Sequence, residues 1–313
     1  MNKGTPFRYN LHIHGGTEYM GKGFEKNILP VMSKLEQYQC YIIPGPTKAL
    51  TDMKKDGRPI LLWMHNTPSQ FDKNLFAYLK HNIFLSMLKY IIVPSEFSKQ
   101  ETAKELNIEL DKIIVIPNAI ENYKYDSSKF DNPKQIKLIN TSSPDRGLEV
   151  LLKAVEKVDR DFRLEIYNMF DPDIMQIEQD EKIIESFDSR IFFYSRTPRA
   201  TVKDAVEKSH ILAYPSTYPE TFCLSLAESM AAGLVPIYSE YGALMEVSEG
   251  RGTHYPFIDD KDKHAEVFAE KLTQAIDLVK SGSWNPEEQI NYINNKYSWD
   301  AIKQHWLELH DKL

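Results

Sequence analysis

The chain has 313 residues, which is longer than one typical domain and enough for two domains that each bury their own core. With 42% hydrophobic, 27% charged and 12% aromatic residues, its composition is that of a soluble globular protein and excludes a disordered chain. The formal net charge of -7 argues against broad nonspecific attraction to nucleic acid, which needs an excess of Lys and Arg.

The search for targeting signals and the number of cysteines indicate in which cellular compartment the protein is expected. The sequence holds no apolar run long enough to cross a bilayer, and its first residues lack the apolar stretch of a secretory signal, so we expect a cytoplasmic protein. The two cysteines, Cys40 and Cys223, lie far apart. Such usage fits a reducing compartment and excludes both a disulfide framework and a zinc site built on thiolates. Both are expected to be small buried residues.

The first part of the chain alternates short apolar runs with helical patterns, which is typical of parallel sheets covered by helices. A strand over 8–14 is expected to enter a turn at Gly15 and Gly16, followed by a helix through residues 23–37. Apolar runs that end near Pro or Gly predict further strands. The remaining elements of this part are strands over 40–43, 60–64, 91–93 and 113–116 and a helix from Ser95 or Ser98 to Leu106.

A polar stretch, residues 122–133, separates this series from a second one. It shows neither a helical nor a strand period, so we place a domain boundary there. The second series predicts a full doubly wound domain. Its elements cover 136–139, 146–158, 163–167, 174–186, 191–194, 201–208, 211–214, 223–232 and 235–238. The last segment, 285–313, is predicted to be an amphipathic helix with Trp299 and Trp306 at core-like spacing.

Two glutamates stand out in the loop and helix that follow the predicted strand over 211–214. Ligands of open parallel sheets bind at the carboxyl ends of strands, where helix N-termini offer free amides to phosphate. This loop turns into a helix at about Phe222, with Glu220 before the helix and Glu228 within it. A mid-helix Glu usually faces water, but Glu228 has apolar neighbours. Its carboxylate therefore needs partners, and ligand hydroxyls are natural ones.

The residues around this pair resemble a known family. Pro215 and Ser216, followed by Glu220 and then the run Phe-x-Leu-x-x-x-Glu-x-Met-Ala-x-Gly from Phe222 onward, are similar to the retaining glycosyltransferases of the GT-B fold, glycosyltransferase family four, also called glycosyl transferases group 1. The resemblance implies an α/β protein with two Rossmann-like, doubly wound domains facing across a cleft. A C-terminal helix is implied to cross back to the N-terminal domain.

The implied domains follow from the boundary above. They are an N-terminal, acceptor-side domain over 1–122, a donor domain over 123–290 and a C-terminal helix over 291–313. Within the first domain, Gly15, Gly16 and Thr17 resemble the family's glycine loop, whose backbone faces the donor phosphates. His65, at the end of a predicted strand, resembles the family's histidine near the acceptor and the donor sugar.

The loop that opens the second domain departs from the family pattern. Typical members have an Arg and a Lys there to hold the diphosphate, whereas this loop offers only Arg146, with Ser142 before it. Because a helix start disfavours a merely solvated cation, we expect Arg146 to be functional. The second cation stays unassigned; Arg196 and Arg199 are candidates, although neither matches the family motif.

A further loop is implied to contact the nucleotide base. It contains Ser195, Arg196 and Thr197, and its contacts with the base would be made largely through the backbone. Such a loop tolerates many side chains and therefore does not identify the base. The whole implied donor site consists of Gly15, Gly16, Thr17, Ser142, Arg146, Ser195, Arg196, Thr197, Glu220, Thr221, Phe222, Cys223, Leu224 and Glu228.

The resemblance implies transfer of a sugar from a nucleoside diphosphate sugar to an acceptor hydroxyl, of a glycan or another acceptor, with retention. Glu220 would hold sugar hydroxyls, His65 would position the reacting sugar and Arg146 would stabilise the leaving phosphate. Glu228 would accept hydrogen bonds from the ribose. Neither a metal ion nor a cofactor is implied.

Two pairs of residues, one of aspartates and one of histidines, have the spacing of possible metal ligands. Asp171 and Asp173 form an Asp-x-Asp, but they flank a Pro in a loop, and we interpret them as a turn. His12 and His14 share one face of a predicted strand. Since no third ligand is visible in the pattern, packing or a donor-facing role is favoured over a metal site.

Other functions stay open, among them a phosphorylase or epimerase of the same architecture, because fold does not fix function. An enzyme of the same fold could glycosylate modified bases in DNA, and the Lys-, Asn- and Ile-rich texture is typical of a viral or low-GC genome. The acidic balance disfavours a DNA acceptor, and a base in duplex DNA would have to be flipped out. The other alternative is a non-catalytic nucleotide-sugar-binding subunit, which the incomplete Arg and Lys pair would suit.

Overall fold

The computed structural model describes residues 16–28, 41–44, 60–71, 73–167, 188–194 and 197–312. The chain forms two compact units. Unit 1 comprises residues 1–120 and 296–313, and unit 2 comprises residues 121–295. The C-terminal segment, residues 296–313, therefore belongs to the same unit as residues 1–120.

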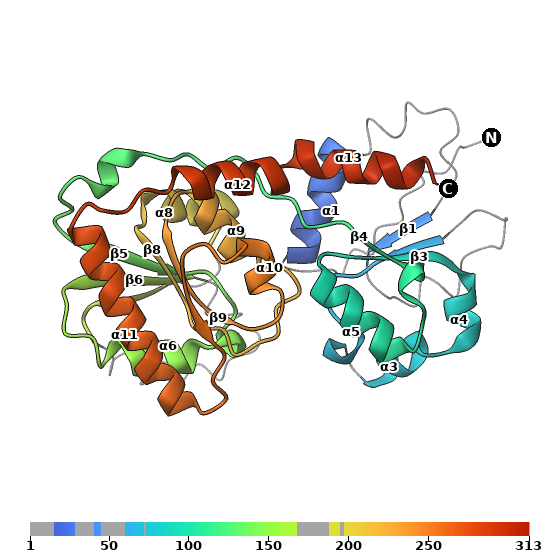
Figure 1. The fold of residues 1–313 in the computed structure, drawn as a ribbon, viewed down its shortest axis with the longest axis horizontal. Helices are drawn as coiled ribbons and strands as arrows, with labels where there is room; N and C mark the ends of the chain where they lie inside the picture. Colours follow the sequence, from blue (N-terminus) through green and yellow to red (C-terminus); the bar gives the residue numbers. More distant parts are fainter. Residues whose placement is uncertain are drawn as a thin grey trace. The chain divides into compact units, whose positions relative to one another are not determined.

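Unit 1 contains a parallel sheet of four strands in the order β1-β2-β3-β4 (Figure 1). Its elements are α1 (Gly16–Asn27), β1 (Tyr41–Pro44), β2 (Ile60–Trp63), η2 (Pro68–Gln70), α3 (Lys73–Leu79), α4 (Asn82–Met87), β3 (Leu88–Val93), α5 (Glu96–Leu106), η3 (Leu110–Lys112), β4 (Ile113–Val115) and α13 (Trp299–His310). Ser95 caps α5, because its side chain accepts a hydrogen bond from the amide of Ser98.

Alternation along β2 divides the core of unit 1 between the two faces of its sheet. Leu62 and Met64 belong to the cluster formed with α3, α4 and α5. The intervening Trp63 packs against Phe24 of α1 and Trp306 of α13, with ring centroids 5.6 and 5.0 Å away. These aromatic contacts attach α1 and α13 to the sheet.

The C-terminal segment forms two helices where one was predicted. α12 covers Glu287–Tyr297, and α13 begins at Trp299. Between them Ser298 has an extended backbone, and its side chain accepts a hydrogen bond from the amide of Ala301 at 3.3 Å. This cap starts a new helix and explains why the single helix over 285–313 was a wrong prediction.

Unit 2 contains a parallel sheet of six strands in the order β10-β9-β8-β5-β6-β7. Its elements are η4 (Ser127–Phe130), β5 (Ile136–Asn140), η5 (Pro144–Arg146), α6 (Leu148–Val155), β6 (Phe162–Tyr167), β7 (Ile191–Tyr194), α8 (Arg199–Lys208), β8 (Ile211–Tyr214), α9 (Leu224–Ala231), β9 (Val235–Glu240), α10 (Leu244–Ser248), β10 (Thr253–Pro256), α11 (Lys261–Lys280) and most of α12.

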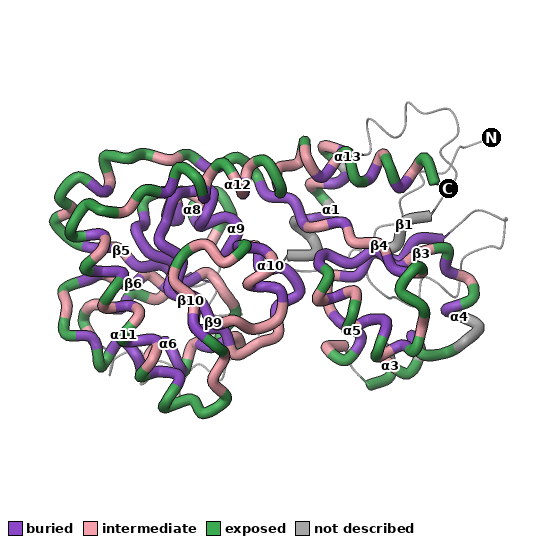
Figure 2. The backbone as a smooth tube through the Cα atoms, viewed as in Figure 1, coloured by how far each residue is buried: buried purple, intermediate pink, exposed green. Residues whose placement is uncertain are grey.

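Helices cover both faces of this sheet. α6 and α11 lie side by side on one face, and α8 and α9 lie on the other (Figure 1). The central strands β5, β8 and β9 are buried along almost their whole length (Figure 2). Their near-continuous apolar sequences fit this position, because a strand covered on both faces needs no polar alternation.

Two helix starts differ from the prediction. α1 begins at Gly16, so Gly16 and Thr17 lie in the first turn of a helix and not in a glycine turn. In unit 2 the helix expected from Arg146 begins only at Leu148. Gly147 has a φ of +117°, which no α-helix accommodates, and it separates the short turn η5 from α6.

Several predicted features lie outside the described residues: the strand over 8–14 with His12 and His14, Gly15, the helix beyond residue 28, Cys40, Asp171 and Asp173, the helix over 174–186, Ser195 and Arg196. Among the helices that the structure describes, none combines the length and apolar character that spanning a membrane requires.

Candidate functional site

The strand order of unit 2 locates its ligand-binding edge. From β5 the chain adds β6 and β7 on one side, and it then returns to β8 on the other side of β5 before adding β9 and β10. The order therefore reverses between β5 and β8. In open parallel sheets, ligands bind beside the carboxyl ends of the strands at this switch point. The two loops concerned are residues 141–147 and 215–223.

The backbones of these two loops are in direct contact. The amide of Thr217 donates to the carbonyl of Arg146 at 3.3 Å. Gly147 lies so close to the other loop that a Cβ on it would sit 3.0 Å from the carbonyl carbon of Pro215 and closer still to its oxygen. Asn140, at the end of β5, donates to the carbonyl of Ala213 at 2.8 Å and so fastens the strand ends together.

Gly147→Ala is expected to lower the free energy of unfolding by about 2 to 4 kcal/mol, because the left-handed backbone and the overlap with Pro215 both oppose a side chain. Denaturant titration measures the loss. Gly282→Ala is the matched control: Gly282 is also left-handed, with a φ of +66°, but has no atom within 4 Å of its added Cβ. Equal losses for the two variants would show that the loop contact contributes nothing.

Glu220 lies where three loops meet. The residue is 3% exposed, and its Oε1 accepts a hydrogen bond from Nη1 of Arg146 at 2.7 Å. The hydroxyl of Tyr214 donates to the same oxygen. Its backbone carbonyl accepts from the amide of Ala243 at 2.7 Å. Gly242, with a φ of +67°, pairs with Glu220 in a parallel bridge, and a Cβ on it would overlap the carbonyl oxygen of Glu220.

Arg146 is held as a cation. Burial alone would lower the pKa of its guanidinium, but the charge of Glu220, together with Tyr214, Cys223 and the hydrogen bond to Glu220, raises the pKa overall. The guanidinium also lies over the ring of Tyr218, 4.5 Å from its centroid. The side chain keeps about a third of its surface exposed, so the charge remains accessible to a ligand.

Ser216, the serine of the Pro-Ser pair, stabilises the loop over 215–223 through hydrogen bonds of its buried side chain and its carbonyl. Its side chain is fully buried, donates to the carbonyl of Tyr218 at 3.0 Å and accepts from the amide of the same residue at 3.3 Å. Its own carbonyl accepts a hydrogen bond from the hydroxyl of Ser239, on β9, at 2.6 Å. The loop is therefore pinned both internally and to the neighbouring strand.

The loop ends at the N-terminus of α9. Cys223 precedes this helix with a φ of +72°, which is uncommon for a residue with a side chain. Burial raises the pKa of its thiol well above the ordinary value, so the thiol stays protonated. Nearby, the hydroxyl of Thr141 donates to that of Ser225 at 2.8 Å and links the first loop to α9. The first amides of α9 thus lie beside Arg146 and Glu220.

Glu228 is buried, as its apolar flanks predicted, with 4% of its surface exposed. Burial raises the pKa of its carboxyl, and the adjacent guanidinium of Arg199 opposes that effect, followed by a hydrogen bond from Tyr123. Arg199 donates directly to Glu228 Oε1. From the sequence, ligand hydroxyls were the expected partners of this carboxylate. The structure gives it a partner within the chain, Arg199, which the sequence suggested only as a second cation for the diphosphate.

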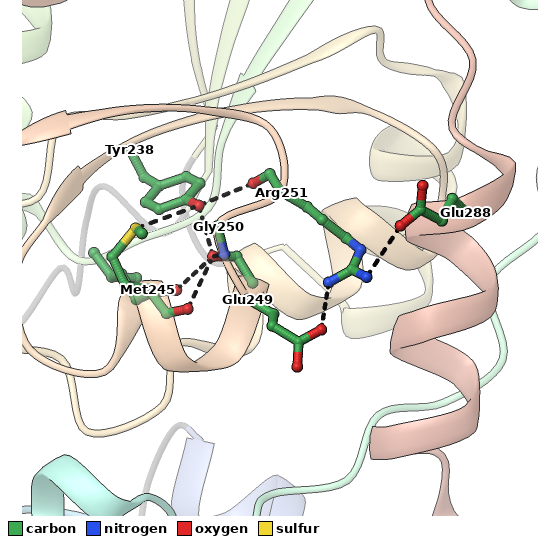
Figure 3. Close-up of polar contacts among 8 residues, drawn as sticks. Tyr238, Met245, Glu249, Gly250, Arg251 and Glu288 are labelled. Carbon is green, nitrogen blue, oxygen red and sulfur yellow. Dashed lines mark hydrogen bonds and ion pairs between the residues drawn. The ribbon is translucent and has the colours of Figure 1, made fainter.

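A polar network ties the segment after α10 to β9 (Figure 3). The hydroxyl of Tyr238 shares a hydrogen bond with that of Ser248 at 2.6 Å and donates to the carbonyl of Arg251 at 2.9 Å. The side chain of Arg251 pairs with Glu249 and Glu288. This network anchors the C-terminal end of α10 and the segment that follows it.

His65 lies in unit 1, two residues after β2. Burial lowers the pKa of its imidazole from 6.5 to about 4, against the opposing effect of a hydrogen bond with Asn118. The ring of Trp63 lies 4.7 Å from the imidazole, centroid to centroid. His65 is therefore neutral at physiological pH, and any role in positioning a sugar falls to the uncharged imidazole.

The lowered pKa of His65 predicts an acid-dependent loss of stability. His65 binds a proton near pH 6.5 in the unfolded chain but only near pH 4 in the folded chain. The contribution of neutral His65 to the free energy of unfolding is therefore fully present above pH 6.5 and is lost as the pH drops toward 4. His65→Gln should flatten the dependence of the melting temperature on pH between these values. Identical slopes for the variant and the wild type would contradict this account.

A separate cavity of about 440 Å³ lies at the amino ends of the strands of unit 2. His210, in its wall, accepts from the amide of Lys137 and contacts the carbonyl of Lys129, each at 2.8 to 2.9 Å. Lys208, also in the wall, pairs with Asp204 at 2.6 Å. Because these polar groups pair with one another, we place the functional site at the opposite edge.

The structure brings part of the predicted donor site together. Arg146 contacts Glu220 directly, and Phe222 to Leu224 form the turn into the helix that carries Glu228. Thr197 lies before α8, and Ser142 donates its amide to Asn140 at 3.1 Å. Sequence reasoning missed Tyr214, Tyr218 and the pairing of Arg199. Tyr214 ends β8 directly before the Pro-Ser pair and Tyr218 follows that pair, and these positions could have suggested both residues.

Known proteins share both the sequence pattern and the fold. Residues 119–298 match the family model described as Glycosyl transferases group 1. The chain is 23% identical over 236 residues to a phosphatidylinositol N-acetylglucosaminyltransferase subunit of Arabidopsis thaliana, an alignment that covers 73% of this chain and 50% of that protein. It is 25% identical over 236 residues to an uncharacterized glycosyltransferase of Methanocaldococcus jannaschii, with 68% and 57% covered.

A solved structure resembles the whole chain. Anabaena HepE in complex with UDP-glucose superposes with a TM-score of 0.73 at 15% identity, over 98% of this chain and 99% of HepE. The likeness confirms the predicted α/β, GT-B fold. The chain spans about half the length of the two curated relatives. Because the family model matches more than half of the sequence, the chain belongs to the group 1 glycosyltransferase family.

Proposed function

We propose that the protein transfers a sugar from a nucleoside diphosphate sugar to an acceptor hydroxyl, of a glycan or a similar molecule, with retention of the anomeric configuration. The observation that carries this proposal is the contact between Arg146 and Glu220 at the switch point, directly before the N-terminus of α9. A cation and helix amides suit a diphosphate, and a carboxylate suits sugar hydroxyls.

The diphosphate would lie against Arg146 and the first turn of α9. The exposed part of the guanidinium can donate to phosphate oxygens, and the first amides of a helix carry a partial positive charge. Both groups are fixed before the reaction begins. They would stabilise the negative charge that grows on the leaving phosphate, which is electrostatic catalysis by preorganised donors.

Glu220 would hold the sugar. Its two hydrogen bonds from Tyr214 and Arg146 both reach Oε1, and among the described residues no donor reaches Oε2. Oε2 can therefore accept a hydroxyl of the donor sugar and orient the anomeric carbon. In the reaction, the bond from this carbon to the phosphate oxygen breaks, the bond to the acceptor oxygen forms on the same face, and the acceptor proton moves to the leaving phosphate.

Glu228 would bind the ribose. A carboxylate accepts two hydroxyl hydrogen bonds, and the charge of Arg199 opposes the rise in the carboxyl pKa that burial causes. For His65 we retain the role of a neutral residue that positions the reacting sugar.

A thermal-shift panel of UDP, GDP, TDP and ADP sugars tests donor binding in the full chain. A donor at about 100 times its Kd should stabilise the fold by about 2.7 kcal/mol. The UDP sugars are the first to try, because HepE was solved with UDP-glucose. Arg146→Met should remove the shift. The proposal fails if none of the donors raises the melting temperature of the wild-type protein.

The stereochemical part of the proposal has its own test. Donor that is slowly hydrolysed in the absence of acceptor should release the sugar first as the anomer of the donor. Proton NMR, recorded before the anomers equilibrate, identifies that product. Initial release of the opposite anomer would exclude retention.

A further inference from the structure

Tyr214 connects the end of β8 to Glu220. The residue is the last of the strand, its side chain is 1% exposed, and its hydroxyl donates to Glu220 Oε1. Arg146 donates to the same oxygen from the other loop. One carboxylate oxygen thus has two donors, whereas the described residues supply none to the other oxygen.

The two hydrogen-bond donors differ in whether a bound ligand can draw them away from Glu220. Arg146 is a cation with about a third of its side chain exposed, and a bound diphosphate competes with Glu220 for its hydrogen bonds. The hydroxyl of Tyr214 is neutral and buried. Burial, followed by the charge of Glu220, raises the pKa of Tyr214 well above its ordinary value, so the hydroxyl keeps its proton and acts as a donor throughout the pH range of activity.

We infer that Tyr214 is a positioning residue, which holds Glu220 by Oε1 and so presents Oε2 to the hydroxyls of the donor sugar. The inference rests on the proposed function, because it assigns a role through Glu220. Strand β8 is buried along its whole length and paired on both sides, which makes the hydroxyl a well-defined reference point for the carboxylate.

The neighbouring strand provides a matched residue. Tyr238 of β9 is the register partner of Tyr214, and it too is buried. Its hydroxyl, however, bonds to Ser248 and to the carbonyl of Arg251, at the C-terminal end of α10 (Figure 3). Removing either hydroxyl deletes the same atom from adjacent buried positions, but only Tyr214 contacts Glu220.

Steady-state kinetics of donor turnover in Tyr214→Phe, Tyr238→Phe, Glu220→Gln and the double variant Tyr214→Phe/Glu220→Gln test the inference. Loss of a hydrogen bond to a charged group lowers a rate by about 10- to 100-fold when the bond is needed in the transition state. The kcat of Tyr214→Phe should therefore fall by about that factor, while KM for the donor changes less than about threefold. Tyr238→Phe should retain its kcat. The donor-induced thermal shift shows that each variant keeps a folded site.

The double variant separates the two proposals. It should be no slower than Glu220→Gln, because Tyr214 acts only through that carboxylate. An unchanged kcat in Tyr214→Phe, or the same fold loss on the Glu220→Gln background, overturns the positioning role. Full activity of Glu220→Gln itself would overturn the proposed function of Glu220 instead.

Discussion

Replacing Glu220 with Gln is expected to reduce kcat for sugar transfer by about 100- to 1000-fold, the loss that typically follows removal of one preorganised polar group from an active site. The substitution keeps the shape of the side chain but removes its charge. The amide no longer pairs with Arg146, and it cannot present two equivalent oxygens, one held by Tyr214 and one facing the sugar.

The same variant should stay folded and still bind nucleotide. The guanidinium of Arg146 is about one-third exposed, so water can replace its lost partner, and the expected cost in stability is about 1 to 3 kcal/mol. Glu240→Gln is the matched control, since Glu240 ends the adjacent strand β9 and pairs with His254 at 2.7 Å without reaching the donor loop. A control variant as slow as Glu220→Gln would refute the assignment.

Replacing Glu228 with Ala is expected to weaken donor binding by about 100-fold or more, because two hydrogen bonds from ribose hydroxyls to a buried carboxylate are lost. Calorimetric titration with the nucleoside diphosphate measures the effect on the nucleotide alone. The fold should survive, because Arg199 is 43% exposed and can be solvated once its partner is gone.

The matched control for Glu228 is Glu270→Ala, a substitution of an exposed glutamate on α11 that bonds only to Gln274 in the described structure. Its nucleotide affinity should equal that of the wild type. Undiminished affinity in Glu228→Ala would remove Glu228 from the ribose site and leave its pairing with Arg199 as a purely structural contact.

The strands of unit 2 could be predicted well from local sequence. β7 and β8 occur at the predicted bounds, because short β-branched and aromatic runs between turn residues have few other solutions. The burial of Glu228 followed equally from its apolar neighbours. In contrast, α11 was not predicted, although its apolar residues recur at helical spacing after an Asp260 N-cap.

The geometry of the site could not be predicted, because it depends on contacts between residues that lie far apart in the sequence. The break between η5 and α6 arises because Gly147 approaches the backbone of Pro215, a residue of a different loop. The pairing of Arg199 with Glu228 joins two helices whose proximity is a property of the sheet order. The family motif identified Arg146 and Glu220, but only the fold shows that they contact each other through Glu220 Oε1.

Hydrogen–deuterium exchange of the full chain, with and without the sugar nucleotide selected by the thermal-shift panel, tests the central claim most directly. The claim is that the loops after β5 and β8, together with the start of α9, bind the donor. Exchange should slow in peptides covering 141–148 and 215–228 and remain unchanged in α11. Protection confined to other parts of unit 2, with these loops unaffected, would contradict the account.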